Sequence, residues 1–313
     1  MTTGEAVLCV NHLHDSTSGR YQPVQLYSDQ TDHLQLEGSY KCINHLDELT
    51  HSYCVATDSP VSSLYCGLRG EVRVFDVSRP GRESWAHSTK EESGQQGIIS
   101  CLDISQTLPI YAAGSFDRTV GLYSTQGERL CQLRGHSGGV TQVTFTRDGT
   151  KLLTGARKDS EIICWDLRQP GRVLYTLRRV VHTNQTVAFS LSPCNKFLVS
   201  ANTDGSVRVW DLTSSADQQT GELQPLTGWM LHHDAVTGVS WHPHGDKLAT
   251  ATGQRHFSTE QEDLDSIENV IVVWNMSNTQ SNDYLSFSFK AMDEGHINIF
   301  NKPLPSLKLQ LKN

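Results

Sequence analysis

The sequence lacks any apolar run that approaches the roughly 20 residues needed to cross a bilayer as a helix. Residues Met1 to Asp15 lack the basic flank and apolar stretch of a secretory signal. None of the eight cysteines forms a C-x-x-C pair, and most of them lie in apolar, strand-like runs. These absences argue against a membrane span and against a paired-cysteine zinc site. They predict buried, reduced thiols in a cytosolic or nuclear protein.

Signatures of catalysis are also missing. There is no Gly-rich phosphate loop, no metal-ligand spacing and no nucleophile elbow. The formal net charge of −8 argues against indiscriminate nucleic-acid binding through a uniformly basic surface, but it leaves room for a local basic face. We therefore expect a protein that is not an enzyme, with no cofactor, no metal, no small-molecule substrate and no membrane partner.

The sequence does contain an internal repeat. In its clearest copy, Val140–Phe145 alternates like a half-buried strand, Arg147-Asp148-Gly149 makes a turn, and Lys151–Ala156 and Glu161–Asp166 are the next two strands. Strands of this kind end in an aromatic residue followed by a small polar one, at Tyr27-Ser28, Phe75-Asp76, Tyr123-Ser124, Trp165-Asp166, Trp210-Asp211 and Trp274-Asn275. The steps between these pairs are 48, 48, 42, 45 and 64 residues, and the longest step contains an acidic insertion at 258–268. Because WD40 blades repeat at about 40–45 residues, the pattern predicts an all-β WD40 β-propeller of four-stranded blades.

The blades can be counted along the chain. Recognisable copies cover 50–80, 97–133, 138–178, 183–214 and 235–278, and residues 22–42 match only the last two strands of another. We expect an irregular segment at 1–21, a propeller at 22–278 and an atypical tail at 279–313, in which residues 307–311 alternate like one closing strand. The propeller would have six or seven blades and be incomplete at its N-terminus. Either the product is truncated or alternatively spliced, or it closes with six blades.

Four residues of the clearest copy form a predicted structural set. In propellers of this type a Gly-His histidine, a strand threonine, a turn aspartate and the strand-ending tryptophan form a hydrogen-bonded chain. Here the set would be His136, Thr154, Asp159 and Trp165, and Asp117 and Asp204 occupy the matching turns of two other blades. A catalytic triad is a much weaker interpretation, because a triad would also need a cleft and an oxyanion hole.

Several stretches go beyond what the repeat demands. They are Asn44-His45-Leu46-Asp47-Glu48-Leu49-Thr50, Gly97-Ile98-Ile99-Ser100-Cys101, Gly155-Ala156-Arg157-Lys158-Asp159, Cys164-Trp165-Asp166-Leu167-Arg168-Gln169, Thr183-Asn184-Gln185 and Ala251-Thr252-Gly253-Gln254-Arg255. In this order and spacing they resemble the telomerase Cajal body protein family of WD40 proteins, from about Pro23 to Asn278. The sequence departs from that family at both ends.

The resemblance implies a nuclear, RNA-binding scaffold or chaperone of Cajal bodies. Family members recognise the Cajal body box in the loops of small Cajal body RNAs and of telomerase RNA, and direct these RNAs to Cajal bodies without covalent chemistry. The implied partners are therefore those RNAs and components of their ribonucleoproteins.

The residues themselves also favour an RNA face. Loops between second and third strands share one face of a propeller with the loops that join blades. The candidate contacts on that face are Asn44, His45, Arg69, Arg118, Arg157, Lys158, Arg179, Asn184, Gln185, Gln254 and Arg255. Arginine suits phosphate, asparagine and glutamine can read base edges, and His45 or His182 could stack on an unpaired base.

A protein-interaction propeller is the alternative. Trp165-Asp166-Leu167-Arg168 resembles the W-D-x-R box of substrate receptors for cullin-type ubiquitin ligases. The box is short, and Arg168 could equally form a hydrogen bond within its own blade. A basic face would favour RNA over this alternative.

Overall fold

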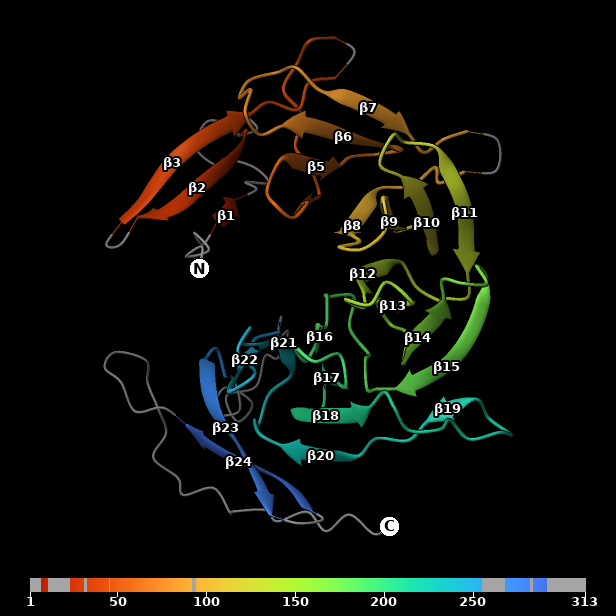
Figure 1. Cartoon of the computed structure of the whole chain (residues 1–313), viewed down its shortest axis with the longest axis vertical. Coiled ribbons are helices and arrows are strands. Elements are labelled where there is room, and N and C mark those ends of the chain that lie inside the picture. The colour runs from red at the N-terminus through yellow and green to blue at the C-terminus, as the bar shows by residue number, and fades with distance from the viewer. Residues whose placement is uncertain are drawn as a thin grey trace, which may run out of the picture. The chain divides into compact units, whose positions relative to one another are not determined.

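The computed structural model describes residues 7–10, 23–30, 33–44, 46–91, 94–254, 268–281 and 284–291. Every regular element in these ranges is a β-strand (Figure 1), and no helix able to span a membrane is found there. The chain divides into two compact units, one of residues 1–156 and 163–174 and the other of residues 157–162 and 175–313. The prediction of an all-β fold of four-stranded antiparallel blades is confirmed.

The first unit begins with a three-stranded sheet, in which β2 (Val24–Gln30) pairs with both β1 (Val7–Val10) and β3 (His33–Tyr40). Two four-stranded sheets follow, and the strands of each stand side by side in chain order. They are β4 (Cys54–Thr57), β5 (Ser63–Gly67), β6 (Glu71–Asp76) and β7 (Trp85–Ser88), then β8 (Ile99–Ile104), β9 (Ile110–Ser115), β10 (Thr119–Ser124) and β11 (Arg129–Arg134). This in-order antiparallel arrangement is that of a propeller blade.

The next sheet has the order β12-β13-β14-β15-β19. Its strands are β12 (Val140–Phe145), β13 (Lys151–Ala156), β14 (Glu161–Asp166), β15 (Arg172–Arg178) and the two-residue β19 (Glu222–Leu223), which pairs in parallel with β15. The clearest copy of the sequence repeat is therefore a four-stranded blade extended by one short strand.

The second unit holds two more four-stranded sheets. Their strands are β16 (Phe189–Leu191), β17 (Phe197–Ala201), β18 (Ser206–Asp211) and β20 (Thr227–Met230), then β21 (Val236–Trp241), β22 (Lys247–Thr252), β23 (Ile271–Ser281) and β24 (Tyr284–Ala291). The last sheet continues past Asn278, because β24 pairs with β23 along its length. The strand expected at 307–311 lies outside the described residues.

The central strands of the blades are buried on both faces. In β13 the residues from Leu152 to Ala156 are all buried, and in β17 all five residues are. Such strands read as continuous apolar runs rather than as strict alternation. Within the first unit Phe145, Leu152 and Trp165 belong to one apolar cluster, and within the second Trp229 and Trp274 belong to another.

Burial on both faces requires the polar groups inside a blade to bond to one another. The buried hydroxyl of Thr154 in β13 accepts a hydrogen bond from Trp165 Nε1 (2.9 Å) and bonds to His136 Nε2 at 2.7 Å. Three members of the expected set are thus in direct contact. The fourth, Asp159, is also buried, and its carboxylate accepts a hydrogen bond from Glu161 N at 3.1 Å.

The other blades vary this arrangement. In the β8–β11 blade a buried glutamine takes the central place: Gln95 Nε2 donates to Thr119 Oγ1 (3.0 Å), and Tyr123 donates its hydroxyl hydrogen to Gln95 Oε1 (3.0 Å). In the β16–β20 blade Trp210 is fully buried, and its Nε1 has no hydrogen-bond partner among the described residues. The blade fold therefore tolerates loss of this hydrogen bond when the ring is well packed.

A half-buried aspartate in β8 gives the first prediction. Asp103 Oδ2 accepts a hydrogen bond from Phe145 N in β12 (2.7 Å), and burial raises the pKa of Asp103 from 3.8 to about 6. A carboxyl whose pKa is raised by folding favours the folded state at low pH, and that contribution is lost as pH rises through its folded-state value.

We expect the contribution of Asp103 to the free energy of unfolding to fall by on the order of 2–3 kcal/mol between about pH 4 and pH 6. Urea unfolding of the wild type and of Asp103→Asn, measured across this pH range, isolates the contribution of the Asp103 carboxyl, because asparagine does not titrate. The difference between the two proteins should change with pH. Parallel profiles would show that Asp103 titrates normally.

Candidate nucleic-acid interface

In the first unit, two of the candidate arginines flank one loop between blades. Arg69 lies in the β5–β6 turn and Arg118 in the β9–β10 turn, and both are exposed. Arg69 forms an isolated antiparallel bridge with Ile98, and Phe116 N donates to the carbonyl of the same Ile98 (3.0 Å). Asp117 Oδ2 accepts from the backbone N–H of Gly97 at 3.2 Å. The structure therefore holds Arg69 and Arg118 on the two sides of residues 96–98.

In the second unit, the turn that carries Arg157 and Lys158 is bonded to the loop that carries Asn184 and Gln185. Lys158 N donates to Thr183 O (3.1 Å), and Gln185 N donates to Thr183 Oγ1 (3.1 Å). Lys158, Asn184 and Gln185 are exposed, as is His182, and Arg157 is half-buried. One cationic turn and one polar loop thus form a continuous surface.

The backbone of these turns shows that the cations are not demanded by the fold. Arg118 and Lys158 have φ values of 72° and 51°, in the left-handed region that costs a residue with a Cβ roughly 1 kcal/mol. In the turn between β17 and β18 the residue that corresponds to Arg118, directly after the turn aspartate, is Gly205, with φ of 82°. Glycine would satisfy the same turn without strain, so a long cation at this position is compatible with a role in binding.

One candidate contact is placed wrongly by the sequence. Arg179 was expected on the exposed face, but it is 2% exposed, and burial lowers the pKa of its guanidinium to about 10. Its Nη1 donates to Val187 O (2.8 Å), and its backbone N–H donates to Ser160 O (2.8 Å). Arg179 therefore holds the two ends of the 179–188 loop together. The sequence could not show this, because the pattern of charges near the end of a strand does not reveal which arginine points into the protein.

Two amide side chains expected to read bases are occupied within the protein. Asn44 Oδ1 accepts from the N–H groups of Leu46 (2.8 Å) and Glu48 (3.0 Å), which closes a local turn. Gln254 Nε2 donates to Asp234 Oδ1 at 2.8 Å. Both residues support loops rather than present free amides. His45 and Arg255 lie outside the described residues.

A second buried histidine network lies in the β21–β24 blade. Thr250 Oγ1 accepts a hydrogen bond from Trp274 Nε1 (2.8 Å) and bonds to His232 Nε2 (2.8 Å), while His232 Nδ1 lies 3.2 Å from Glu268 Oε2. Burial lowers the pKa of His232, although the carboxylate of Glu268 opposes this. The sequence pattern missed Glu268, because this residue ends the acidic insertion instead of sitting in a short turn.

Asp234 holds the two ends of that insertion. Besides accepting from Gln254, its Oδ2 accepts from Glu268 N at 3.3 Å, and the residue is 5% exposed. In the sequence, only the position of Asp234 two residues after His232 hinted that it bonds to Gln254 and Glu268. Both histidine networks are buried and bonded within their blades, which makes them part of the scaffold.

The burial of Arg179 gives a prediction about stability. Arg179→Ala leaves a cavity and removes the bond to Val187 O, so it should lower the free energy of unfolding by about 2–4 kcal/mol. Its neighbour Arg178 is a matched control, because its side chain is 61% exposed and pairs with Glu222 at 2.7 Å. Arg178→Ala should cost at most about 1 kcal/mol. Urea unfolding of both variants decides the point, and equal losses would contradict the buried role of Arg179.

Comparison with known proteins agrees with these features. The family model described as WD domain, G-beta repeat matches residues 127–166, 171–211 and 224–256. The chain is 46% identical over 246 residues to telomerase Cajal body protein 1 of Mus musculus, across 77% of this chain and 45% of that protein. It is 43% identical over 257 residues to the protein of the same name from Homo sapiens, across 81% of this chain and 46% of that protein.

A more distant relative and a solved structure extend the comparison. The telomerase Cajal body protein 1 homolog of Drosophila melanogaster is 29% identical over 256 residues, across 79% of this chain and 44% of that protein. The chain thus spans less than half the length of these relatives. A chain from the crystal structure of a mitotic checkpoint complex matches with a TM-score of 0.62 at 18% identity, over 87% of this chain and 73% of that chain, which shows the fold alone. The matched repeats and the four-stranded blades show that this chain is a WD40 β-propeller protein, and its sequence resembles telomerase Cajal body protein 1 over about 80% of its length.

Proposed function

We propose that this chain is a non-catalytic RNA-binding scaffold that recognises Cajal body box RNAs and directs them to Cajal bodies in the nucleus. Small Cajal body RNAs and telomerase RNA are the proposed ligands, and components of their ribonucleoproteins are the proposed protein partners. The relatives are telomerase Cajal body proteins by name, which supports the telomerase and Cajal body parts of this proposal.

The observation that carries RNA binding is the surface formed by Lys158 with the 182–185 segment. It joins an exposed ammonium group to exposed imidazole and amide side chains, although the chain as a whole has a net charge of −8. A cation can engage phosphate and fix position, while His182, Asn184 and Gln185 can stack on or hydrogen-bond to unpaired bases. Hydrogen bonds between the turn and the loop hold the groups in place, so little ordering entropy is lost on binding.

The ligase-receptor alternative has less support from the position of Arg168. Its Nε and Nη2 donate to the two carboxylate oxygens of Asp166 at 3.0 and 3.1 Å, and these bonds lower the pKa of that carboxyl. Arg168 thus forms hydrogen bonds within its own blade, as expected of a residue with a purely structural role.

The test of this function is a titration of a labelled hairpin RNA with the Cajal body box in its loop, against one with a scrambled loop, at two salt concentrations. We expect Lys158→Gly to weaken binding to both hairpins by about fivefold and to reduce the salt slope by about one. Because glycine accepts the left-handed turn without strain, this variant should be at least as stable as the wild type.

Lys196→Ala is the matched control, because it removes the same charge from the β16–β17 turn at the other end of the strands. It should leave RNA affinity unchanged. Asn184→Ala and Gln185→Ala should instead reduce the preference for the intact loop while leaving the salt slope as it was. Equal binding of the two hairpins by the wild type, or equal losses in Lys158→Gly and Lys196→Ala, would refute the proposed surface.

A further inference from the structure

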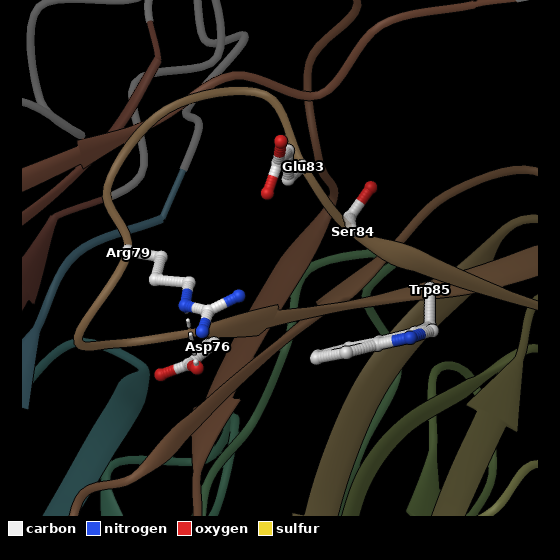
Figure 2. Close-up of a pocket in the computed structure, with 5 residues that line it drawn as sticks. All are labelled: Asp76, Arg79, Glu83, Ser84 and Trp85. Carbon is white, nitrogen blue, oxygen red and sulfur yellow. Dashed lines mark ion pairs between the residues drawn. The ribbon is translucent and has the colours of Figure 1, made fainter.

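A small pocket lies at the end of the β4–β7 blade, away from the candidate RNA contacts of that blade. It is lined by Asp76, Arg79, Glu83, Ser84 and Trp85 (Figure 2). Arg69 lies in the turn from β5 to β6, whereas this pocket is formed by the loop from β6 to β7. Because β6 has six residues, the two places are separated by about 20 Å along the strand. The pocket therefore belongs to a different end of the blade.

Trp85 is the unusual feature of this pocket. It is 61% exposed, whereas Trp165, Trp210, Trp229 and Trp274 are each at most 6% exposed and Trp241 is half-buried. Figure 2 shows its indole ring extending beneath the space bounded by Arg79 and Glu83. An exposed tryptophan beside a pocket offers a large apolar and π surface for a partner.

The loop that forms the pocket is held in place at several points. Tyr40 donates its hydroxyl hydrogen to Val77 O (2.8 Å), and Lys41 N donates to Gly81 O (2.7 Å). Arg82 pairs with Asp47 at 2.5 Å. These bonds fix the loop between β6 and β7 against the segment that follows β3, so the pocket is formed before any partner binds.

The charges in the pocket leave one carboxylate available. Asp76 Oδ1 accepts hydrogen bonds from Ser78 N (2.9 Å) and Ser78 Oγ (2.6 Å), and its Oδ2 lies 3.9 Å from Arg79 Nε. Asp76 is therefore held mainly by Ser78, and Arg79, whose side chain is 76% exposed, is only a long-range partner of its carboxylate. Glu83 is exposed and makes no hydrogen bond or ion pair with any residue that the structure describes.

An unpaired carboxylate next to the face of an indole ring complements a cation. An ammonium or guanidinium group gains from the ring quadrupole and from the carboxylate at once. The strand that carries Trp85 also lies at the edge of its sheet, in the order β4-β5-β6-β7, so its outer backbone groups can pair with an added extended segment.

We propose that this pocket docks a basic segment of a partner protein, with one lysine or arginine side chain held between Trp85 and Glu83. The segment lies extended along the free edge of β7. This site is independent of the proposed RNA surface formed by Lys158 and residues 182–185, since the two share no residue. A propeller with both sites could hold an RNA and a basic protein at the same time.

The probe is a short peptide, acetyl-Thr-Val-Arg-Val-Thr-amide, compared with the same peptide carrying glutamine in place of arginine. Trp85 itself reports binding, because it is the most exposed tryptophan of the described residues. At low salt the arginine peptide should change tryptophan fluorescence saturably, and the glutamine peptide should bind at least fivefold more weakly. Glu83→Gln should weaken the arginine peptide about fivefold, and Trp85→Ala should abolish the signal.

Glu128→Gln is the matched control, because it neutralises an exposed carboxylate in the β10–β11 turn and should leave peptide binding unchanged. Far-ultraviolet circular dichroism checks that each variant is folded. No saturable binding, equal binding of the two peptides, or a Glu83→Gln variant that binds like the wild type would overturn the proposal. A response of Trp85 to a short oligouridylate instead of the peptide would overturn it in favour of a nucleic-acid site.

Discussion

The hydroxyl of a buried threonine in each of two blades, β12–β15 and β21–β24, is the interaction on which much of this structure depends. Thr154 and Thr250 each bond at once to the indole nitrogen of the third strand and to a histidine that precedes the first strand. Strands buried on both faces leave these polar atoms no access to water, so each must find its partner inside the blade. These hydrogen bonds fix the segment that carries the histidine, the second strand and the third strand of the blade relative to one another. Because the turns at the end of the blade connect these strands, the same hydrogen bonds also fix the positions of the turns.

The fixed turns place exposed cations on a protein whose formal net charge is −8. The strained φ of Lys158 and Arg118 places long cations at turns where the fold alone would accept glycine. Below the second-unit surface, buried Arg179 binds the carbonyl of Val187 and ties the 179–188 loop to Ser160. The charge that supports the loop is thus distinct from the charges that face solvent. Recognition by such a surface depends on geometry set during folding rather than on rearrangement during binding.

The repeat was visible in the sequence because two-sided burial selects a regular pattern of apolar runs and strand-ending aromatics, as in Leu152 to Ala156 and at Trp165. Exposed outer strands carry no such pattern: β7 reads Trp-Ala-His-Ser, and its pairing with β6 appears only in three dimensions. Single buried polar residues were equally hidden. Arg179 looked like a surface cation, and Glu268 looked like part of a solvated acidic loop, because burial depends on the neighbouring loop and not on the residue's own segment. Candidate cations at Arg69, Arg118 and Lys158 were found because turns between regular strands are easy to count.

We propose that RNA bases lie against the surface formed by Lys158 and residues 182–185. Photo-crosslinking tests it most directly: a hairpin carrying 4-thiouridine within the Cajal body box loop is irradiated with the full chain, and the attached peptides are mapped by mass spectrometry. We expect crosslinks within residues 157–160 and 182–186, and far fewer of them at 182–186 when the loop is scrambled. Crosslinks concentrated on the outer strands, such as β7 or β20, or identical maps for both loops would contradict it.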